Sequence, residues 1–419
     1  MNAMRWSKKH KGAGSSLSGA AWPLVLALWC AAAPISGREP SLGRVEVMAP
    51  STPRTDVYTT VAVVARTETW DIDRDFRGEA WLWTDGPWIR PFHVKFVAAD
   101  RGVIFQPLKF ELPALQRIEA YSLTGVIQSW SDPVFPVADN YRGPRLFWGK
   151  LGDCAAPGLD FCIAEHGERP PAAGPGKPAL GVPLLITGLS KQAGAETWHI
   201  IINPGLDPAA QTALVENLKA AAKPEKILEI FAEQEGGLLL AVPPVGKGLA
   251  LPPHLLVVTG QPDDASPAGG FMEGFKNSWP AARGRGTVMA AVADRDGWIG
   301  VWSEGDEAPS IWKALGRGDA YASWGGRTFI DWKGNFSAAA ANGALRIMVA
   351  GRGPREEVSL LRDSGGELGQ AASWSTDDFR LDRSFRGAAP GGASRFFIAV
   401  TEPGSPRGSH ALAGPLLIK

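Results

Sequence analysis

Histidine, cysteine and net charge are all low in this chain, and each shortage excludes a class of function. The 419 residues include six histidines and three cysteines, and Lys plus Arg equals Asp plus Glu at 43 each. So few histidines cannot fill a site that holds several metal ions mainly through imidazole, and so few thiols cannot form a cysteine-based metal site. No Walker loop, Rossmann glycine pattern or Ser–His–Asp arrangement is visible either.

The first 37 residues predict a cleaved export signal. The basic stretch Arg5–Lys11 precedes the apolar run Ala20–Ala33, which is short for a membrane helix. Small residues near the end of this region favour cleavage after Gly37, and bulky Trp29 in front of Cys30 argues against a lipoprotein. We therefore expect a periplasmic or secreted protein with no membrane insertion after signal cleavage.

Removal of this signal changes the charge of the chain. It takes away four basic residues and leaves 39 Lys and Arg against 43 Asp and Glu, a net charge near −4. This negative charge argues against nucleic acid or an anionic membrane as the partner. We expect the partner to be a protein, a small molecule or a glycan.

Export also decides how the remaining cysteines are interpreted. Cys154 and Cys162 are the two that the signal does not contain, and an even pair in an oxidising compartment favours a disulfide. Closing so short a loop stabilises the folded state by roughly 2.5 kcal/mol in the chain-entropy model. The alternative, a thiolate metal site, lacks further thiols.

Three segments of different character follow the signal, in a chain long enough for two or three domains. Residues 44–140 contain short strands between turns and predict an N-terminal β-sandwich of immunoglobulin type. Residues 141–327 alternate strands and helices and predict an α/β barrel or an open parallel sheet, although about 180 residues is short for eight units. Residues 328–419 return to strands and predict a C-terminal β-domain.

The middle segment has the clearest periodicity. Asp207 followed by Pro208 is a helix start, with Leu214 and Leu218 on one face. Further helices are expected at residues 225–234 and 309–315. The expected strands are Leu159–Ala164, Val182–Thr187, His199–Ile202, Gly237–Val242, Leu255–Thr259 and Thr287–Ala293.

Several blocks resemble the polymerase and histidinol phosphatase (PHP) metallohydrolase family. Arg145–Cys154 and Leu159–Gly167 resemble its first two strands, with the apolar frame retained in Leu146–Leu151. Arg317–Asp331, with its Tyr-Ala-Ser-Trp-Gly-Gly-Arg run, is similar to the family pattern Arg-x-Tyr-Ala-Thr-Thr-Gly-x-Arg-Ile, and Arg395–Glu402 resembles a closing strand. The similarity covers residues 140–419 and is to an exported bacterial subgroup of unknown function with flanking β-domains.

This resemblance implies an α/β plus all-β fold. A reduced, distorted (β/α) barrel of PHP type, similar to a TIM barrel, would lie between the N-terminal β-sandwich and the C-terminal β-domain. Family members bind two or three metal ions, mainly through histidines, and these ions generate a hydroxide that attacks phosphate esters.

Most ligand positions of that cluster are replaced here. Lys150 stands where the family has Asp, Gly152 and Cys154 where it has His, and Ser190 where it has a carboxylate. These positions, with the retained Glu165, mark a vestigial site. The metal donors that remain are His166, His199, Asp294 and Asp296.

The replacements favour a pseudoenzyme, an exported protein of PHP-like fold that acts as a binding or assembly module. One alternative is a mononuclear metal-dependent hydrolase of phosphoesterase type, which would use the remaining donors and one weakly bound zinc or manganese ion. Another is a carbohydrate-binding protein. The chain contains 17 Trp residues, most of which are expected in cores, and outward-facing Trp side chains clustered on a β-face would favour this last alternative.

Overall fold

The computed structural model describes most of the chain after residue 43, within one compact unit, Leu42–Lys419. The described residues are 44–67, 71–84, 92–121, 128–156, 158–166, 183–193, 196–233, 237–242, 255–258, 275–276, 279, 290–293, 297–332, 345–351, 357–364, 367–376, 378–385, 394–401 and 410–418.

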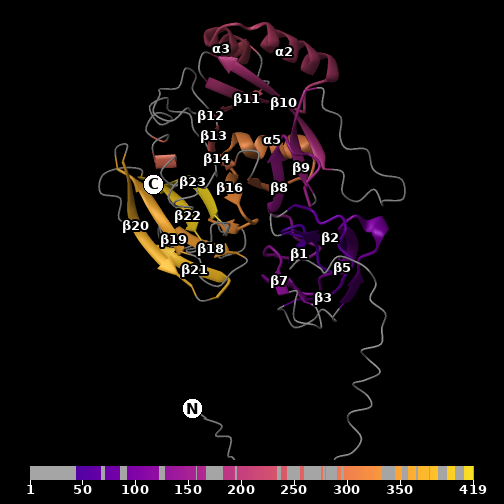
Figure 1. Ribbon diagram of the computed structural model, residues 1–419. Helices are drawn as coiled ribbons and strands as arrows, with labels where there is room; N and C mark the ends of the chain where they lie inside the picture. The colour runs from indigo at the N-terminus through magenta and orange to yellow at the C-terminus, as the bar shows by residue number, and fades with distance from the viewer. Residues whose placement is uncertain are drawn as a thin grey trace, which may run out of the picture. The chain divides into compact units, whose positions relative to one another are not determined.

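The N-terminal segment consists of two antiparallel sheets that share one hydrophobic core (Figure 1). One sheet has the order β1-β2-β5, formed by β1 (Arg44–Met48), β2 (Tyr58–Arg66) and β5 (Val103–Lys109). The other has the order β4-β3-β6-β7, formed by β4 (Phe92–Lys95), β3 (Glu79–Thr84), β6 (Ile118–Tyr121) and β7 (Gln128–Trp130). Because side chains alternate along a strand, Val63 of one sheet and Leu82 of the other both point into this core.

A sheet of 13 strands forms most of the remaining structure, in the order β14-β13-β12-β11-β10-β9-β8-β15-β16-β23-β22-β19-β20. Its strands are β8 (Arg145–Leu151), β9 (Phe161–Glu165), β10 (Leu184–Ala193), β11 (Glu196–Ile202), β12 (Gly237–Val242), β13 (Leu255–Val258), β14 (Ala290–Ala293), β15 (Trp298–Ser303), β16 (Ala320–Trp324), β19 (Glu357–Asp363), β20 (Leu368–Ser375), β22 (Ser394–Thr401) and β23 (His410–Ile418). A third small sheet is formed by β17 (Phe329–Asp331), β18 (Leu345–Ala350) and β21 (Arg380–Phe385).

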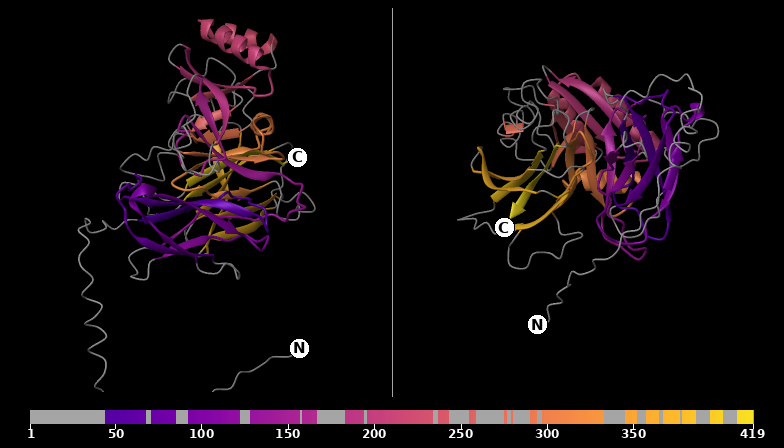
Figure 2. Two further views of the ribbon diagram at one scale, coloured as in Figure 1. Left: turned by 90° about the vertical axis from the view of Figure 1, so that its right-hand side faces the viewer. Right: turned by 60° about the horizontal axis from the view of Figure 1, so that its bottom comes forward.

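Three α-helices lie within the described residues. Helix α2 (Pro208–Ala220) begins where the sequence predicts, because the Asp207 carboxylate accepts hydrogen bonds from two backbone amides of its first turn. Helix α3 (Pro224–Glu233) follows it, and Figures 1 and 2 show both far from the N-terminal sheets. Helix α5 (Ala308–Gly316) packs on the large sheet. None of the described helices is long and apolar enough to cross a membrane.

The end of β11 is buried on both faces of the large sheet. Ile200 and Ile202 pack in the core that includes Leu214 of α2, whereas Ile201 between them packs in the core that includes Ile311 of α5. This end of the strand has no polar side to alternate with, so its last three residues are all apolar, although the strand begins Glu-Thr-Trp-His.

The predicted fold class is wrong. The described residues form twenty-three strands and three α-helices, which is a mostly β structure without the helical ring of a TIM-like barrel. The pairs β10/β11, β11/β12, β8/β15 and β15/β16 are antiparallel, where the predicted barrel needs parallel neighbours. Short apolar runs look alike in parallel and antiparallel sheets, so the elements can be predicted from the sequence but their pairing cannot.

The division into domains at residues 140 and 328 stays a prediction. Strands from both sides of residue 328 share one sheet, because β16 pairs with β23 through Tyr321↔Ala413 and Trp324↔His410. Residues 44–140 contribute their own two sheets.

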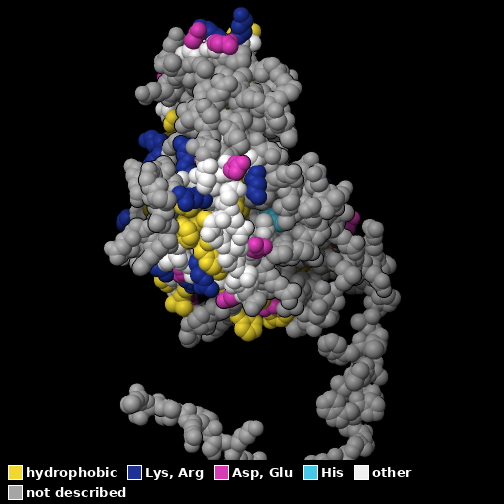
Figure 3. All heavy atoms as spheres, turned by 90° about the vertical axis from the view of Figure 1, so that its left-hand side faces the viewer, with side chains coloured by type: hydrophobic (Ala, Val, Ile, Leu, Met, Phe, Trp, Pro, Cys, Tyr) yellow, Lys and Arg dark blue, Asp and Glu magenta, His cyan; other side chains and the backbone are white. Residues whose placement is uncertain are grey.

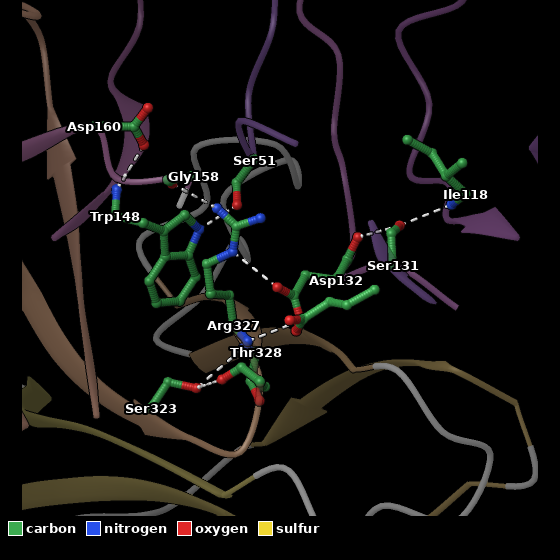
Figure 4. A network of polar contacts seen from close by, with 12 residues as sticks. Ser51, Ile118, Ser131, Asp132, Trp148, Gly158, Asp160, Ser323, Arg327 and Thr328 are labelled. Carbon is green, nitrogen blue, oxygen red and sulfur yellow. Dashed lines mark hydrogen bonds and ion pairs between the residues drawn. The ribbon is translucent and has the colours of Figure 1, made fainter. Parts of the chain in front are cut away.

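A buried ion pair joins the N-terminal sheets to the large sheet. The Arg327 side chain donates from Nε to Asp132 Oδ2 at 2.8 Å, and its backbone amide donates to the other carboxylate oxygen at 2.9 Å (Figure 4). Its Nη1 donates to the carbonyl of Gly158 at 3.1 Å. The two charged side chains are 0% and 2% exposed. A buried pair holds its geometry because neither charge can exchange its partner for water.

Further polar contacts surround this pair (Figure 4). The indole of Trp148 donates to the hydroxyl of Ser51, which ties β8 to the segment after β1. Asp160 accepts a hydrogen bond from the backbone amide of Trp148 at 2.8 Å. Burial raises the pKa of Asp160 to about 6, and the Trp148 amide and the charge of Arg327 offset part of that effect.

We expect Arg327→Met to lower the free energy of unfolding by about 3–5 kcal/mol, because the change leaves the Asp132 carboxylate buried without its cation. Urea unfolding of the purified protein measures this. The matched control is Lys219→Met, which removes the exposed pair with Glu216 at 3.0 Å and should change stability by less than about 1 kcal/mol. Equal changes in the free energy of unfolding for the two substitutions would show that the buried pair stabilises the protein no more than an exposed pair does.

The Asp160 carboxyl should make stability depend on pH. Its pKa is about 6 in the folded state and near 3.9 when unfolded, so the folded state binds the proton more tightly. Its contribution is therefore complete below about pH 4 and is lost as pH rises through 6. Asp160→Asn should match the wild type near pH 4 and exceed it by roughly 1–2 kcal/mol at pH 7.5. Parallel urea curves at the two pH values test this, and an Asn variant that is less stable at both would contradict it.

Candidate functional site

Two residues of the predicted vestigial site and one predicted metal donor meet at neighbouring strands of the large sheet. Ser190 on β10 is the register partner of His199 on β11, and Glu165 ends the adjacent strand β9. The Ser190 hydroxyl contacts the Glu165 carboxylate and lies 2.8 Å from Nδ1 of His199. The Ser190 amide also donates to Glu165, at 3.2 Å. We call these three residues the Glu165–Ser190–His199 cluster.

The single proton of the Ser190 hydroxyl fixes the direction of these bonds. The hydroxyl donates to the Glu165 carboxylate and therefore accepts from His199, which bears its proton on Nδ1 in this arrangement. In a Ser–His–Asp triad the imidazole lies between the serine and the carboxylate, so that it can take the serine proton. Here the serine lies in the middle, and its proton is directed at the carboxylate.

The space beside this cluster is small. The cavity lined by Gly152, Glu165, Gly188 and His199 measures about 10 Å³, which is about the room that one water needs. A phosphate ester does not fit in this volume. The three side chains of the cluster therefore hydrogen-bond to one another beside a small void, which is an arrangement that stabilises the fold.

Among the other predicted site residues that the structure describes, Gly152 lines the same small cavity, whereas His166 and Lys150 make contacts with other groups. His166 is exposed, and its backbone amide donates to the carbonyl of Gly188 at 2.8 Å. The ammonium of Lys150 lies 3.7 Å from Asp153 and 5.0 Å from the ring centroid of Trp298. Gly152 occupies a left-handed turn at φ 84°. Asp294 and Asp296 lie outside the described residues.

The metal cluster implied by the resemblance does not match what the structure describes. Within the described ranges, no group of three or more His, Cys, Asp and Glu side chains is placed to hold a metal ion. Glu165 and His199 are connected through the Ser190 hydroxyl. The described donor set thus does not fit a site of two or three ions.

Cys154 and Cys162 form a disulfide, as the sequence predicts. Their Cα atoms lie 5.4 Å apart, within the range that a disulfide spans. Cys162 lies on β9 and Cys154 in the turn after β8, so the bridge ties the connection between two parallel strands. The half-cystines also pack against Leu159 and Ala164.

A second candidate site lies on the outer face of the N-terminal sheet β4-β3-β6-β7. Along β3, Ala80 and Leu82 are buried, while Trp81 is half-buried and Trp83 is 47% exposed. Tyr121 is the register partner of Trp81 on one side and His93 on the other, so the three side chains share a face. The rings of Trp81 and His93 have centroids 4.9 Å apart. We call Trp81, Trp83, His93 and Tyr121 the aromatic face.

Polar groups border the aromatic face. The Glu79 carboxylate accepts from the Lys95 ammonium at 2.9 Å and lies 3.2 Å from Nε2 of His93. The hydrogen bond from Lys95, followed by the one from His93, lowers the pKa of Glu79. Glu119 is the register partner of Trp83 and adds a second carboxylate to this face. The surface therefore combines flat rings with ionised and hydrogen-bonding groups.

Sequence reasoning missed the aromatic face, although a signal was present. The strand Glu79-Ala-Trp-Leu-Trp-Thr84 alternates small or aliphatic residues with two tryptophans. With period 2, Ala80 and Leu82 on one face can pack into a core, which leaves both tryptophans on the other. The pairing of Tyr121 and His93 with Trp81 could not be read from the sequence, since it depends on the register of three strands.

Comparisons with known proteins place the chain in no family. Neither a protein-family model nor a characterised protein matches it in sequence. Among solved structures, a two-domain protein from Bacteroides vulgatus that contains a predicted PHP-like metal-dependent phosphoesterase matches 65% of this chain and 96% of its own, at 9% identity and a TM-score of 0.28.

Two other solved structures are similar over larger parts of this chain. A tetra-tandem repeat from the extending region of a large adhesion protein matches 89% of this chain and 74% of its own, at 8% identity and a TM-score of 0.18. Dimeric latent PorU from Porphyromonas gingivalis matches 90% of this chain and 33% of its own, at 8% identity and a TM-score of 0.17. At such scores the matches support no conclusion about fold or activity.

Ser190→Ala should lower the free energy of unfolding by about 1–2 kcal/mol, because Glu165 and His199 lose the hydroxyl that bridges them. It should also shift the Nδ1 resonance of His199 in ¹⁵N NMR spectra. Ser373→Ala is the matched control: its hydroxyl donates to Glu357 at 3.0 Å in an exposed position, where the loss should stay below about 0.5 kcal/mol. An unchanged His199 resonance would contradict the assigned bonds.

Proposed function

We propose that this protein is an exported glycan-binding protein that uses the aromatic face of its N-terminal sheet. The observation that carries the proposal is the projection of Trp81, Trp83 and Tyr121 from one side of adjacent strands, with Trp83 47% exposed. A soluble protein normally buries rings of this size, and neighbouring exposed rings are typical of a binding surface.

The chemistry of the face suits sugars. An indole offers a flat apolar surface against which the C–H groups of a sugar ring can pack, while the indole N–H can bond a hydroxyl. The hydroxyls at the rim of a sugar need hydrogen-bond partners, and Glu79, His93 and Glu119 supply carboxylate and imidazole groups beside the rings. Both kinds of group are present on one face.

The sheet also supplies rigidity. Trp81 and Trp83 are two residues apart on β3, so their Cα atoms are separated by about 7 Å along a paired strand. Paired strands on both sides hold these positions, because β3 is bonded to β4 and to β6. A preformed surface loses little conformational entropy when a glycan binds.

The alternative of a mononuclear hydrolase has less support. Of its donors, His199 is bonded to Ser190 beside a cavity of about 10 Å³, and His166 is exposed. On the aromatic face, by contrast, Trp83 is 47% exposed. We therefore favour binding over turnover as the role of this protein.

Trp83→Ala and Trp81→Ala should each weaken glycan binding by about tenfold, which corresponds to about 1.4 kcal/mol for the loss of one stacked ring. A glycan array and insoluble polysaccharides identify a ligand for the full mature chain, and calorimetry then measures the affinity of each variant. The control is Tyr58→Ala, which removes a 72% exposed ring from the other N-terminal sheet and should leave affinity unchanged.

Two outcomes would overturn the proposal. One is a wild-type protein that binds no glycan in either format. The other is a glycan whose affinity is the same for wild type and for both Trp variants. If the wild type instead binds a protein partner and Trp83→Ala abolishes that binding, the aromatic face is assigned to protein recognition.

A further inference from the structure

We infer that the C-terminal strands contain a second binding site, which takes a small molecule with one carboxylate and a flat or apolar ring. The site is a cavity of about 290 Å³ lined by Arg362, Ser364, Gly369, Gln370, Phe385 and Phe396. This volume is near the lower end for ligand pockets and suits a single ring with its substituents. This site and its ligand are different from the aromatic face and its glycan, so the inference does not depend on the proposed function.

Strand register explains why these residues meet. Arg362 on β19 is the partner of Gly369 on β20 and of Phe396 on β22, and direct partners project to the same side of a sheet. Phe385 ends β21, a strand of the small sheet β17-β18-β21. The cavity thus lies where the large sheet meets a second sheet.

A glycine keeps the cavity open. A Cβ atom placed on Gly369 would have no other atom within 4 Å, so the space above this position is unfilled. Glycine inside a strand weakens the strand and often marks the close approach of another group. Two residues further on, the register shifts, because Leu360 pairs with Ala372 and Leu361 with Gln370. The resulting bulge at Ala371 redirects this part of β20, as bulges beside binding sites do.

The lining matches a carboxylate attached to a ring. The guanidinium of Arg362 is a planar fork of donors, which binds a carboxylate through two hydrogen bonds. Phe385 and Phe396 meet edge to face with centroids 5.8 Å apart and give the cavity an apolar wall. The Gln370 amide and the Ser364 hydroxyl supply further donors and acceptors.

The surroundings agree with this ligand. Figure 3, which views the molecule from the side of the C-terminal strands, shows Lys and Arg side chains beside hydrophobic ones, with some Asp and Glu side chains on the same face. The basic side chains attract a negatively charged molecule, and an apolar part of that molecule can cover the hydrophobic side chains. Sugar acids and aromatic acids both have this chemistry.

Calorimetry on the full mature chain tests the site with three probes: glucuronate, benzoate and neutral glucose. We expect at least one of the two acids to bind at least tenfold more tightly than glucose. Gly369→Leu should weaken that binding at least tenfold, because the new side chain fills the cavity, with a melting temperature equal to or above that of the wild type. Arg362→Gln should remove the preference for the acid over glucose.

The matched control is Ser375→Leu, which adds the same side chain to an exposed position of β20 away from the cavity. It should leave the affinity for the acid unchanged. Stronger binding of glucuronate than of benzoate identifies a sugar acid as the ligand class, and the reverse identifies an aromatic acid. Failure of both acids to bind at millimolar concentration, or equal affinity of wild type and Gly369→Leu, would overturn the inference.

Discussion

The buried pair of Arg327 and Asp132 is the contact on which the arrangement of the described strands depends. It joins positions 195 residues apart, and its two side chains are almost fully buried. Asp132 follows the last N-terminal strand, and Arg327 follows β16 in the large sheet. Since each charge offsets much of the desolvation of the other, moving these sheets apart would remove the main partner of both charges in a buried position. The contact to the carbonyl of Gly158 extends the same constraint to the chain that carries the disulfide.

This constraint changes how the resemblance to metallohydrolases is understood. The Tyr-Ala-Ser-Trp-Gly-Gly-Arg run was its most specific block, and the structure buries its polar members for structural purposes. The Tyr321 hydroxyl donates to the carbonyl of Thr328 at 2.9 Å, and the Ser323 hydroxyl accepts from the amide of Thr328 at 3.1 Å. Arg327 completes the ion pair. A motif of this kind specifies a turn between sheets, so it can recur without the chemistry of the family in which it is known.

The candidate sites differ in how they use polar groups. In the Glu165–Ser190–His199 cluster every assigned bond is directed at another member, and the adjoining space is about one water in size. The aromatic face and the C-terminal cavity instead combine rings with charged groups at positions that a ligand can reach. Groups bonded to each other stabilise a fold, whereas groups beside open apolar surface gain most when a partner covers them.

The sequence by itself determined the local elements and the disulfide partners. Helix α2 begins at its Asp-Pro signal, and β12 spans the expected Gly237–Val242. These features depend on caps, periodicity and composition, which act over a few residues. Tertiary structure alone decided the sheet order, the antiparallel pairings that exclude the barrel, the register that places Tyr121 and His93 beside Trp81, and the open position of Gly369. Strand pairing joins residues far apart in the chain, and an apolar run has the same pattern whichever neighbour it pairs with.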